Sequence, residues 1–335
     1  MKIKLVFCLL AVVFCSGCGS KDPKAKWQKK RANIINVKDD IKEIDTDDVL
    51  IGSLAKPYIC GKYLAIADYK SSDKKVRLYD LHTLKYVLSF GDIGQGPTEI
   101  SVLGTVAWNE GDYDLYVTDH GQRRILRYNL DSLLTDSLYS PTIKLRFGDG
   151  NATFPNDYYY INDTLSFGLF IIPMASSSYK WTGGKWNMKT GAMQLIDYVH
   201  PADDKKRISF TFSLQHNTLV ECNQRYDLMS LYNLNGELLC NVYGPSWDKK
   251  GDRKAHFKNA TVYKDKIIVS YIGEDWRNNN GARMLHVFDI GGDYLKTLDV
   301  GYKINYLCCD EKNGRLIMNL DAEIQFGYLD LDKII

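Results

Sequence analysis

The chain has no excess of positive or negative charge once its first 17 residues are set aside. The 335 residues contain 43 Lys and Arg against 41 Asp and Glu, and residues 1–17 hold two of the basic residues, Lys2 and Lys4, and no acidic one. The remainder therefore carries 43 − 2 = 41 basic and 41 acidic residues. A neutral chain offers no electrostatic attraction for a phosphate backbone, so no nucleic acid partner is expected.

The spacing of the cysteines is too irregular for a disulfide framework or a zinc site. Three of the eight lie before residue 19, and the five that remain, an odd number, include no Cys-x-x-Cys pair. The adjacent Cys308 and Cys309 would point to opposite faces of a strand. Free buried thiols are the expectation, with a disulfide between Cys222 and Cys240 as the alternative.

The common catalytic motifs are also missing. The sequence has no Gly-x-Ser-x-Gly elbow, no His-Glu-x-x-His, no phosphate loop and no Asp-box of the sialidase type. Its six histidines are scattered along the chain. These absences disfavour an enzyme without excluding one, and no local motif indicates a metal or another cofactor.

The N-terminus is typical of an export signal. Lys2 and Lys4 precede an apolar run, Leu5 to Phe14, that is too short to span a membrane, and Ser16-Gly17-Cys18 follows. We expect residues 1–17 to be removed, Cys18 to carry the lipid of a bacterial lipoprotein and residues 18–31 to form a flexible polar tether.

An ordinary secretory signal is the alternative, because Cys15 occupies the position where lipoprotein signals usually have Leu. The expected location is the cell envelope, with a lipid anchor in the outer membrane. Whether the domain faces the periplasm or the cell surface is left open by the sequence.

Long helical patterns are absent after the signal, and short β-rich runs separated by turn residues take their place. Six runs end alike, in an aromatic or apolar residue, Asp or Asn, and Leu, Ile or Met. The Asp or Asn positions are Asp80, Asn129, Asn187, Asn233, Asp289 and Asp330, at spacings of 49, 58, 46, 56 and 41 residues. Repeats of this length with four strands each are typical of a β-propeller, in which the Asp or Asn would bind N–H groups of the next turn.

These six anchors predict an all-β, six-bladed β-propeller over residues 32–335. The last anchor lies close to residue 335, so the last blade has only three strands of its own. Residues 34–37 and 41–44 are expected to supply its missing outer strand and to close the ring without an open edge. The third repeat is irregular, and residues 171–181 are expected to form a loop over one face.

One segment resembles a known family. Residues 90–100 contain Gly94-Gln95-Gly96-Pro97-Thr98-Glu99, which resembles the Gly-x-Gly-Pro-x-Glu segment of the six-bladed β-propeller lipoproteins of the Bacteroidota, the TolB-like group. The glycines permit a chain reversal between blades, and Pro97 restricts it. The resemblance implies the propeller fold and an envelope location, and it implies no particular activity.

Propellers commonly bind ligands on the central axis or on the loops of one rim. Near the axis we expect Asp68, Glu221 and Asn223, although Asp68 fits a strand cap equally well. At the rim, an indole beside carboxylates and amides suits stacking on a sugar ring and hydrogen bonding to its hydroxyls. The rim candidates are Asp275, Trp276 and Arg277 in one loop and Trp181 in another, and both loops also fit plain exposed hairpins.

The sequence therefore predicts a lipid-anchored binding or scaffold module without catalysis, which recognises a glycan, a peptide or an envelope protein. The alternative is a metal-dependent hydrolase or lyase of the lactonase type, with calcium bound on the axis by Asp68, Glu221, Asn223 and Asp310. The fold alone cannot choose between them.

Overall fold

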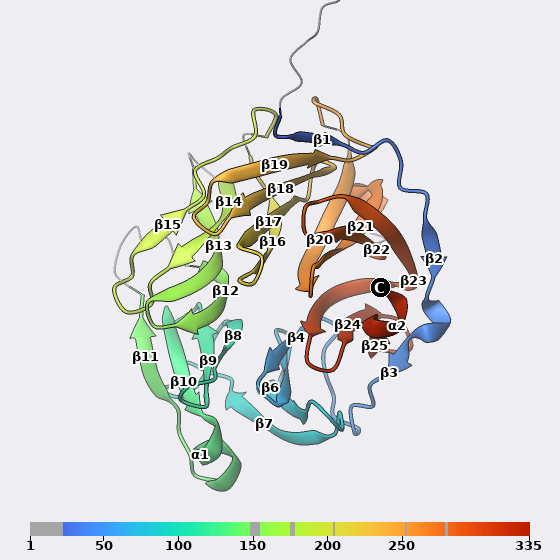
Figure 1. The fold of residues 1–335 in the computed structure, drawn as a ribbon. Coiled ribbons are helices and arrows are strands. Elements are labelled where there is room, and N and C mark those ends of the chain that lie inside the picture. Colours follow the sequence, from blue (N-terminus) through green and yellow to red (C-terminus); the bar gives the residue numbers. More distant parts are fainter. Residues whose placement is uncertain (1–22, 148–154, 175–177, 204, 252, 279–280) are drawn as a thin grey trace, which may run out of the picture.

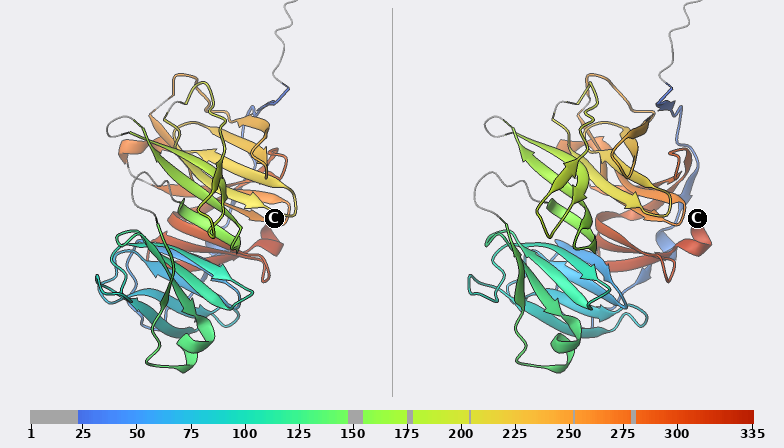
Figure 2. Two further views of the ribbon diagram at one scale, coloured as in Figure 1. Left: turned by 90° about the vertical axis from the view of Figure 1, so that its left-hand side faces the viewer. Right: turned by 60° about the vertical axis from the view of Figure 1, so that its left-hand side comes forward.

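The protein is built almost entirely from β-strands. The computed structural model describes residues 23–147, 155–174, 178–203, 205–251, 253–278 and 281–335, and over this part of the chain 25 strands form five sheets. Figure 1 shows these sheets around a common centre, and Figure 2 shows the same ring from the side. No helix in the described ranges is long and apolar enough to cross a membrane.

Three sheets have four antiparallel strands each, hydrogen-bonded in chain order. The first contains β4 (Ala55–Cys60), β5 (Tyr63–Asp68), β6 (Lys74–Asp80) and β7 (Tyr86–Asp92). The second contains β8 (Leu103–Asn109), β9 (Asp114–Asp119), β10 (Arg124–Asn129) and β11 (Thr142–Arg146). The third contains β12 (Pro155–Asn162), β13 (Leu165–Pro173), β14 (Tyr179–Trp186) and β15 (Met193–Leu195).

The fourth sheet and the large fifth sheet also receive strands from the N-terminal side. The fourth contains β16 (Ile208–Ser213), β17 (Thr218–Asn223), β18 (Leu228–Asn233) and β19 (Leu238–Tyr243), with β1 (Ala25–Trp27) at its edge. The fifth contains β20 (Lys254–Tyr263), β21 (Lys266–Asp275), β22 (Ala282–Asp289), β23 (Tyr294–Asp310), β24 (Arg315–Asp321) and β25 (Phe326–Asp330), together with β2 (Ile34–Asn36) and β3 (Lys42–Glu43).

The large sheet is continuous because β23 is 17 residues long and pairs with two sets of strands. Its first half, up to Asp299, pairs with β22, and its second half, from Lys303, pairs with β24, while Ile304 also pairs with Ala282 at the start of β22. The sheet therefore has the strands of two four-stranded units joined by one long strand.

The N-terminal segment is more ordered than the predicted tether. Within the expected tether at residues 18–31, β1 pairs in parallel with β19. β2 pairs in parallel with β23 rather than completing the last set of strands, and β3 pairs antiparallel with β25. The composition of residues 18–31 predicted disorder because it is polar, but a strand edge offers backbone partners to any sequence.

Five of the six anchors do what the pattern predicts. Asp80, Asn129, Asn233 and Asp289 end the third strands of their repeats, Asn187 follows such a strand, and in each case Oδ1 accepts hydrogen bonds from N–H groups two to four residues further on. Asp330 also ends a strand, β25, but its side chain makes no capping bond to α2 (Leu331–Ile334).

The few helices occupy turns. α1 (Leu130–Thr135) follows the second anchor, because Oδ1 of Asn129 accepts from the N–H of Ser132 and thereby caps a helical turn. The two 3-10 segments are η1 (Lys38–Asp40) and η2 (Trp276–Asn278).

The third repeat is more regular than predicted. Residues 171–173 and 179–181 do not form a loop but extend the β13–β14 ladder, with Ile171 opposite Trp181 and Pro173 opposite Tyr179. Branched and aromatic side chains such as Ile171, Ile172 and Trp181 favour strands, and the ladder satisfies their backbone groups.

A disulfide between Cys222 and Cys240 is ruled out, since both thiols are free. Cys222 lies on β17 and Cys240 on β19, with β18 between them. Two strand spacings separate them by roughly 10 Å, beyond the reach of a disulfide. Burial raises the pKa of both thiols.

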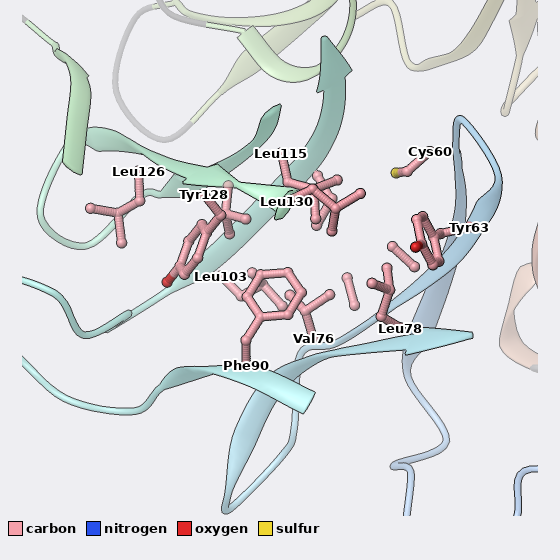
Figure 3. Close-up of a cluster of buried hydrophobic side chains, with 14 of the residues drawn as sticks. Cys60, Tyr63, Val76, Leu78, Phe90, Leu103, Leu115, Leu126, Tyr128 and Leu130 are labelled. Atoms are coloured by element: carbon pink, nitrogen blue, oxygen red, sulfur yellow. The ribbon is translucent and has the colours of Figure 1, made fainter. Parts of the chain in front are cut away.

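Apolar side chains fill the space between neighbouring sheets. Between the first two sheets, Leu78 and Phe90 pack against Leu115 and Leu126 (Figure 3). Similar clusters lie at the other junctions, and Ile317 of the large sheet packs with Leu64 and Ile66 of the first. The core is thus a ring of such junctions rather than one central cluster, which leaves the centre available for polar groups.

The Gly-Pro segment folds around one buried arginine. Arg124 on β10 is fully buried and donates to the carbonyls of Pro97, Gly96 and Glu99 at 2.7, 2.9 and 2.6 Å. Its Nε lies 3.5 Å from Oδ2 of Asp119. The sequence motif therefore encodes a loop whose carbonyls converge on a cation.

Arg31 holds the N-terminal segment against the fourth and fifth sheets. Its Nη1 donates to Oδ1 of Asp227 at 2.8 Å, and the two side chains are 7% and 0% exposed. Its guanidinium lies 5.4–5.7 Å from the ring centroids of Phe257, Tyr271 and Phe288. This buried ion pair forms inside the segment predicted to be a tether.

His286 on β22 lies beside this ion pair. Its Nδ1 is 2.9 Å from Oγ1 of Thr297, and its ring centroid lies 4.2 Å from that of Tyr271. Burial, together with the nearby charge of Arg31, holds the pKa of His286 well below its ordinary value.

We expect acidification to weaken the fold through His286. An unfolded histidine takes up a proton near pH 6.5, whereas the folded protein resists it, so stability is full above that pH and falls below it, by up to about 2 kcal/mol at pH 5. His286→Gln should flatten the fall in urea stability between pH 7 and pH 5. The same change at the exposed His82 should leave the slope as in the wild type, and an unchanged slope in H286Q would contradict the assignment.

Candidate functional site

One face of the ring carries most of the predicted site residues. In an antiparallel pair, the start of the innermost strand lies opposite the end of the second strand. Ala55 is thus paired with Asp68, Ile208 with Asn223 and Lys254 with Asp275. The ends of the second strands and the starts of the innermost strands therefore share a face.

A cavity of about 140 Å³ lies on the axis near this face. Most of its lining comes from the innermost strands β4, β12, β16, β20 and the second half of β23, which surround the centre in Figure 1. The lining residues are Lys56, Asp157, Tyr159, Leu169, Trp181, Ile208, Ser209, Phe210, Gln224, Lys258, Asn259, Ala260, Tyr306 and Leu307. We call it the axial cavity.

An ion pair marks one wall of the axial cavity. Nζ of Lys56 pairs with Oδ2 of Asp157, and Oγ1 of Thr105 donates to the other carboxylate oxygen at 2.9 Å. Burial by itself would lower the pKa of Lys56, but Asp157 and the hydroxyls of Tyr69 and Tyr159 outweigh it and raise the pKa. Lys56 is therefore charged at neutral pH.

Tyrosines surround this ion pair. The hydroxyls of Tyr58 and Tyr69 are 3.1 Å apart, and the ammonium of Lys56 lies 4.8 Å from the centroid of the Tyr58 ring. Burial raises the pKa of Tyr58, Tyr69 and Tyr306, and it raises that of Tyr159 to about 12. At neutral pH these phenols are protonated and can both donate and accept hydrogen bonds.

Lys258 on β20 also lines the axial cavity, but its positive charge has no ion-pair partner like that of Lys56 among the described residues. Nζ donates to the carbonyl of Ile304 at 3.3 Å. Burial lowers the pKa of Lys258 and repulsion from Lys303 lowers it further, while Asp321 opposes the shift.

The predicted rim residue Trp181 belongs to the axial cavity. It lies on β14, and the guanidinium of Arg207 stacks over its ring at 5.2 Å from the centroid. Arg207 is held there by a 2.9 Å bond from Nη1 to the carbonyl of Tyr179. An indole with one face covered by a cation presents its remaining apolar surface and edge to the cavity.

Asp68 and Asn223 stabilise turns on this face instead of lining the axial cavity. Asp68 accepts from the N–H groups of Gly52 and Lys70 at 2.8 and 3.0 Å and lies 3.8 Å from Arg77. It borders a separate cavity of about 750 Å³ beside the first sheet. Oδ1 of Asn223 accepts from the N–H groups of the two residues after Gln224, at 2.9 and 3.1 Å.

Glu221 joins the third and fourth sheets away from the axis. Oε1 accepts from the N–H of Gly183 at 2.8 Å, and Oε2 accepts from the hydroxyl of Tyr232 at 3.0 Å and pairs with Lys206. The residue is 2% exposed. The sequence placed it near the axis because it ends a β-rich run, but it lies on a second strand, whose side chains contact the neighbouring sheet.

The loop with Asp275, Trp276 and Arg277 lies on the same face as a separate exposed unit. Nη2 of Arg277 donates to Oδ2 of Asp275 at 2.6 Å, and this bond, with a further bond from the Arg277 N–H, lowers the pKa of Asp275 to about 2. The Trp276 side chain is 66% exposed and lies outside the axial cavity.

The residues proposed for calcium do not converge. Each binds a separate partner and none of them lines the axial cavity; the four are Asp68, Glu221, Asn223 and Asp310, the last of which accepts from the side-chain amide of Asn313. Among the residues that the structure describes, no group of three His, Cys, Asp or Glu side chains is placed to hold a metal ion.

Sequence reasoning missed the polar residues of the axial cavity. Lys56 and Lys258 lie inside β-rich runs. A charged residue in the middle of such a run was the one signal in the sequence that could have pointed to a polar site. Asp157 and Tyr306 gave no signal, because they meet Lys56 only after the chain has passed around the ring.

Comparisons with known proteins agree on the fold. An exported protein from Bacteroides fragilis superposes with a TM-score of 0.53 over 89% of this chain and 88% of its own, at 14% identity. A member of the DUF4221 family from Bacteroides vulgatus gives 0.56 over 86% and 94%, at 8% identity. A gluconolactonase from Xanthomonas campestris gives 0.53 over 83% and 86%, at 12% identity.

No protein-family model matches the sequence, and no curated protein is significantly similar to it. At the identities found among solved structures, the likeness is one of fold. Antiparallel sheets arranged around a centre, together with these likenesses, make the chain a β-propeller. Enzymes and proteins without a stated activity both occur among the similar structures, so the site has to decide the function.

Proposed function

We propose that this chain is a lipid-anchored, six-bladed β-propeller of the bacterial cell envelope that binds a glycan without catalysis in and around the axial cavity. The blade count treats the large sheet as two blades that share β23, with β3 as the outer strand of the last. In support, each half of β23 pairs with a separate set of strands, and β3 pairs with β25.

The envelope location is supported by the sequence and by one similar structure. Residues 1–17 have the pattern of an export signal, and Cys18, which lies outside the described residues, is the proposed site of lipid attachment to the outer membrane. The similar protein from Bacteroides fragilis is described as exported. The Gly-Pro segment adds the resemblance to TolB-like propeller lipoproteins of the Bacteroidota.

The lining of the axial cavity carries the binding proposal. It combines aromatic surfaces of Trp181, Tyr159 and Tyr306 with the amides of Asn259 and Gln224. Aromatic rings stack on the apolar faces of sugar rings, and amides both donate to and accept from hydroxyls. A cavity well below the 300–1,000 Å³ of drug-sized sites takes one small group, such as a terminal sugar, while the rim contacts the rest.

Peptides and envelope proteins are the other proposed partners, and a metal-dependent hydrolase is the alternative activity. The gluconolactonase shares the fold and thereby keeps the alternative open. The binding role ranks first because the described residues give the lining of the axial cavity one carboxylate, from Asp157, and that carboxylate is paired with Lys56.

Trp181→Ala is expected to weaken glycan binding about tenfold or more, because the indole supplies stacking surface inside the cavity. The measurement is a glycan array with the soluble chain from residue 19 onward, followed by titration calorimetry of the glycans that bind. Trp276→Ala is the matched control and should leave affinity unchanged if the axial cavity is the site.

Loss of binding in W276A but not in W181A would move the site to the exposed loop. Absence of any bound glycan, with capture of a defined peptide instead, would overturn the glycan assignment.

A further inference from the structure

The axial cavity carries an unbalanced positive charge. Three charged side chains contribute to its described lining: Lys56, Asp157 and Lys258. Lys56 and Asp157 neutralise each other as an ion pair, which leaves Lys258 as the excess charge. A half-buried charge without a counter-charge in ion-pair contact is unfavourable, so its presence in a cavity needs an explanation.

No carboxylate of the described residues lies within ion-pair distance of Lys258. Its ammonium has one hydrogen bond, to the Ile304 carbonyl, although three donors are available. Asp321, the carboxylate whose charge opposes the lowering of the Lys258 pKa, is already paired with Nζ of Lys303 at 3.0 Å. Lys258 therefore retains unused donors in a half-buried position on the cavity wall.

The surroundings suit a planar anion on a polar ring. Asn259 follows Lys258 on β20, and its Nδ2 is held by Ser270 and by the carbonyl of Asn305 at 3.3 and 3.2 Å. These bonds hold the strand from which the Lys258 side chain extends. The lining also includes Trp181 and Tyr306, which supply apolar ring surface beside the ammonium.

We propose that the ligand of the axial cavity carries a carboxylate that pairs with Lys258, so that the preferred sugar is a sugar acid such as a uronic acid. This inference rests on the proposed glycan-binding function and narrows its ligand class. The bound anion would supply the missing counter-charge, and a charge-assisted hydrogen bond at a desolvated site discriminates strongly against a neutral analogue.

Titration calorimetry with matched sugars tests the proposal on the soluble chain. The probes are D-glucuronate and D-galacturonate against D-glucose and D-galactose, which differ from them only at the carboxylate carbon. We expect the acids to bind about tenfold to a hundredfold more tightly than the neutral sugars.

Lys258→Met should abolish this preference, and Lys258→Arg should restore part of it. Because K258M removes a poorly compensated buried cation, it should melt no lower than the wild type, so a loss of preference would not reflect unfolding. Lys312→Met, at an exposed turn between β23 and β24, controls for net charge.

Equal affinity for acidic and neutral sugars, or a preference for the acids that persists in K258M, would overturn the carboxylate assignment and leave the glycan-binding function standing. Failure of all four sugars to bind would count against both the assignment and the proposed function.

Discussion

Replacing Arg31 with methionine is expected to lower the free energy of unfolding by about 3–5 kcal/mol. The reason is that Asp227 is fully buried, and its Oδ1 would lose its cationic partner while the remaining bond, from the N–H of Ser246 to Oδ2, persists. The three aromatic rings around the guanidinium would lose a contact as well. Urea denaturation followed by tryptophan fluorescence measures the change.

An exposed ion pair in the same segment provides the control. Lys26 pairs with Asp293 at 3.1 Å, and their side chains are 39% and 68% exposed. Lys26→Met should cost less than about 1 kcal/mol, since water and salt screen such pairs. If R31M were no more destabilising than K26M, the segment would be a tether after all, and its packing against the propeller would not matter in solution.

The second large effect is expected at Arg124. Arg124→Met removes all three bonds to the carbonyls of the Gly-Pro loop and leaves Asp119 buried without its cation, so a loss of about 3–5 kcal/mol is expected. In a chain of this size that corresponds to a fall of roughly 5–8 °C in melting temperature. Differential scanning calorimetry at neutral pH is the measurement.

The neighbouring Arg123 gives a control with the same chemistry. It is exposed, and it has a positive φ of 51° in the turn before β10. Arg123→Met keeps a non-glycine residue at that φ and should change stability by less than about 0.5 kcal/mol. Comparable losses in R123M and R124M would show that the loop depends on its sequence generally and not on the buried cation.

The strands and their ends were predictable because they are encoded locally. Asp80 and Asn233 bind N–H groups a few residues away, so the pattern of anchors appears in a linear sequence. The role of Arg124 was not predictable in the same way, because the three loop carbonyls that it binds lie 25–28 residues before it in the sequence. The pairing of residues 171–173 with residues 179–181 was missed because the third repeat departs from the pattern of the others.

The axial cavity was not predictable in this way. Lys56 and its partner Asp157 are 101 residues apart, and Lys258 and Tyr306 come from two further strands. The five innermost strands supply between one and three lining residues each, so no spacing rule links them. Glu221 was wrongly expected near the axis because it ends a β-rich run. In the structure its carboxylate binds Gly183, Tyr232 and Lys206, which come from other parts of the chain.

If Cys18 carries the proposed lipid, the pairing of β1 with β19 limits how far the domain can move from the membrane. The carbonyl of Lys24 already accepts from the N–H of Asn241 at 2.7 Å, so the chain is fixed from there onward. Five residues lie between Cys18 and Lys24, and the six Cα–Cα steps that join the two span at most about 20 Å. A lipid on Cys18 would therefore keep the outer edge of the fourth sheet near the bilayer, with the ring standing on its rim, and a ligand would enter the axial cavity by moving parallel to the membrane surface.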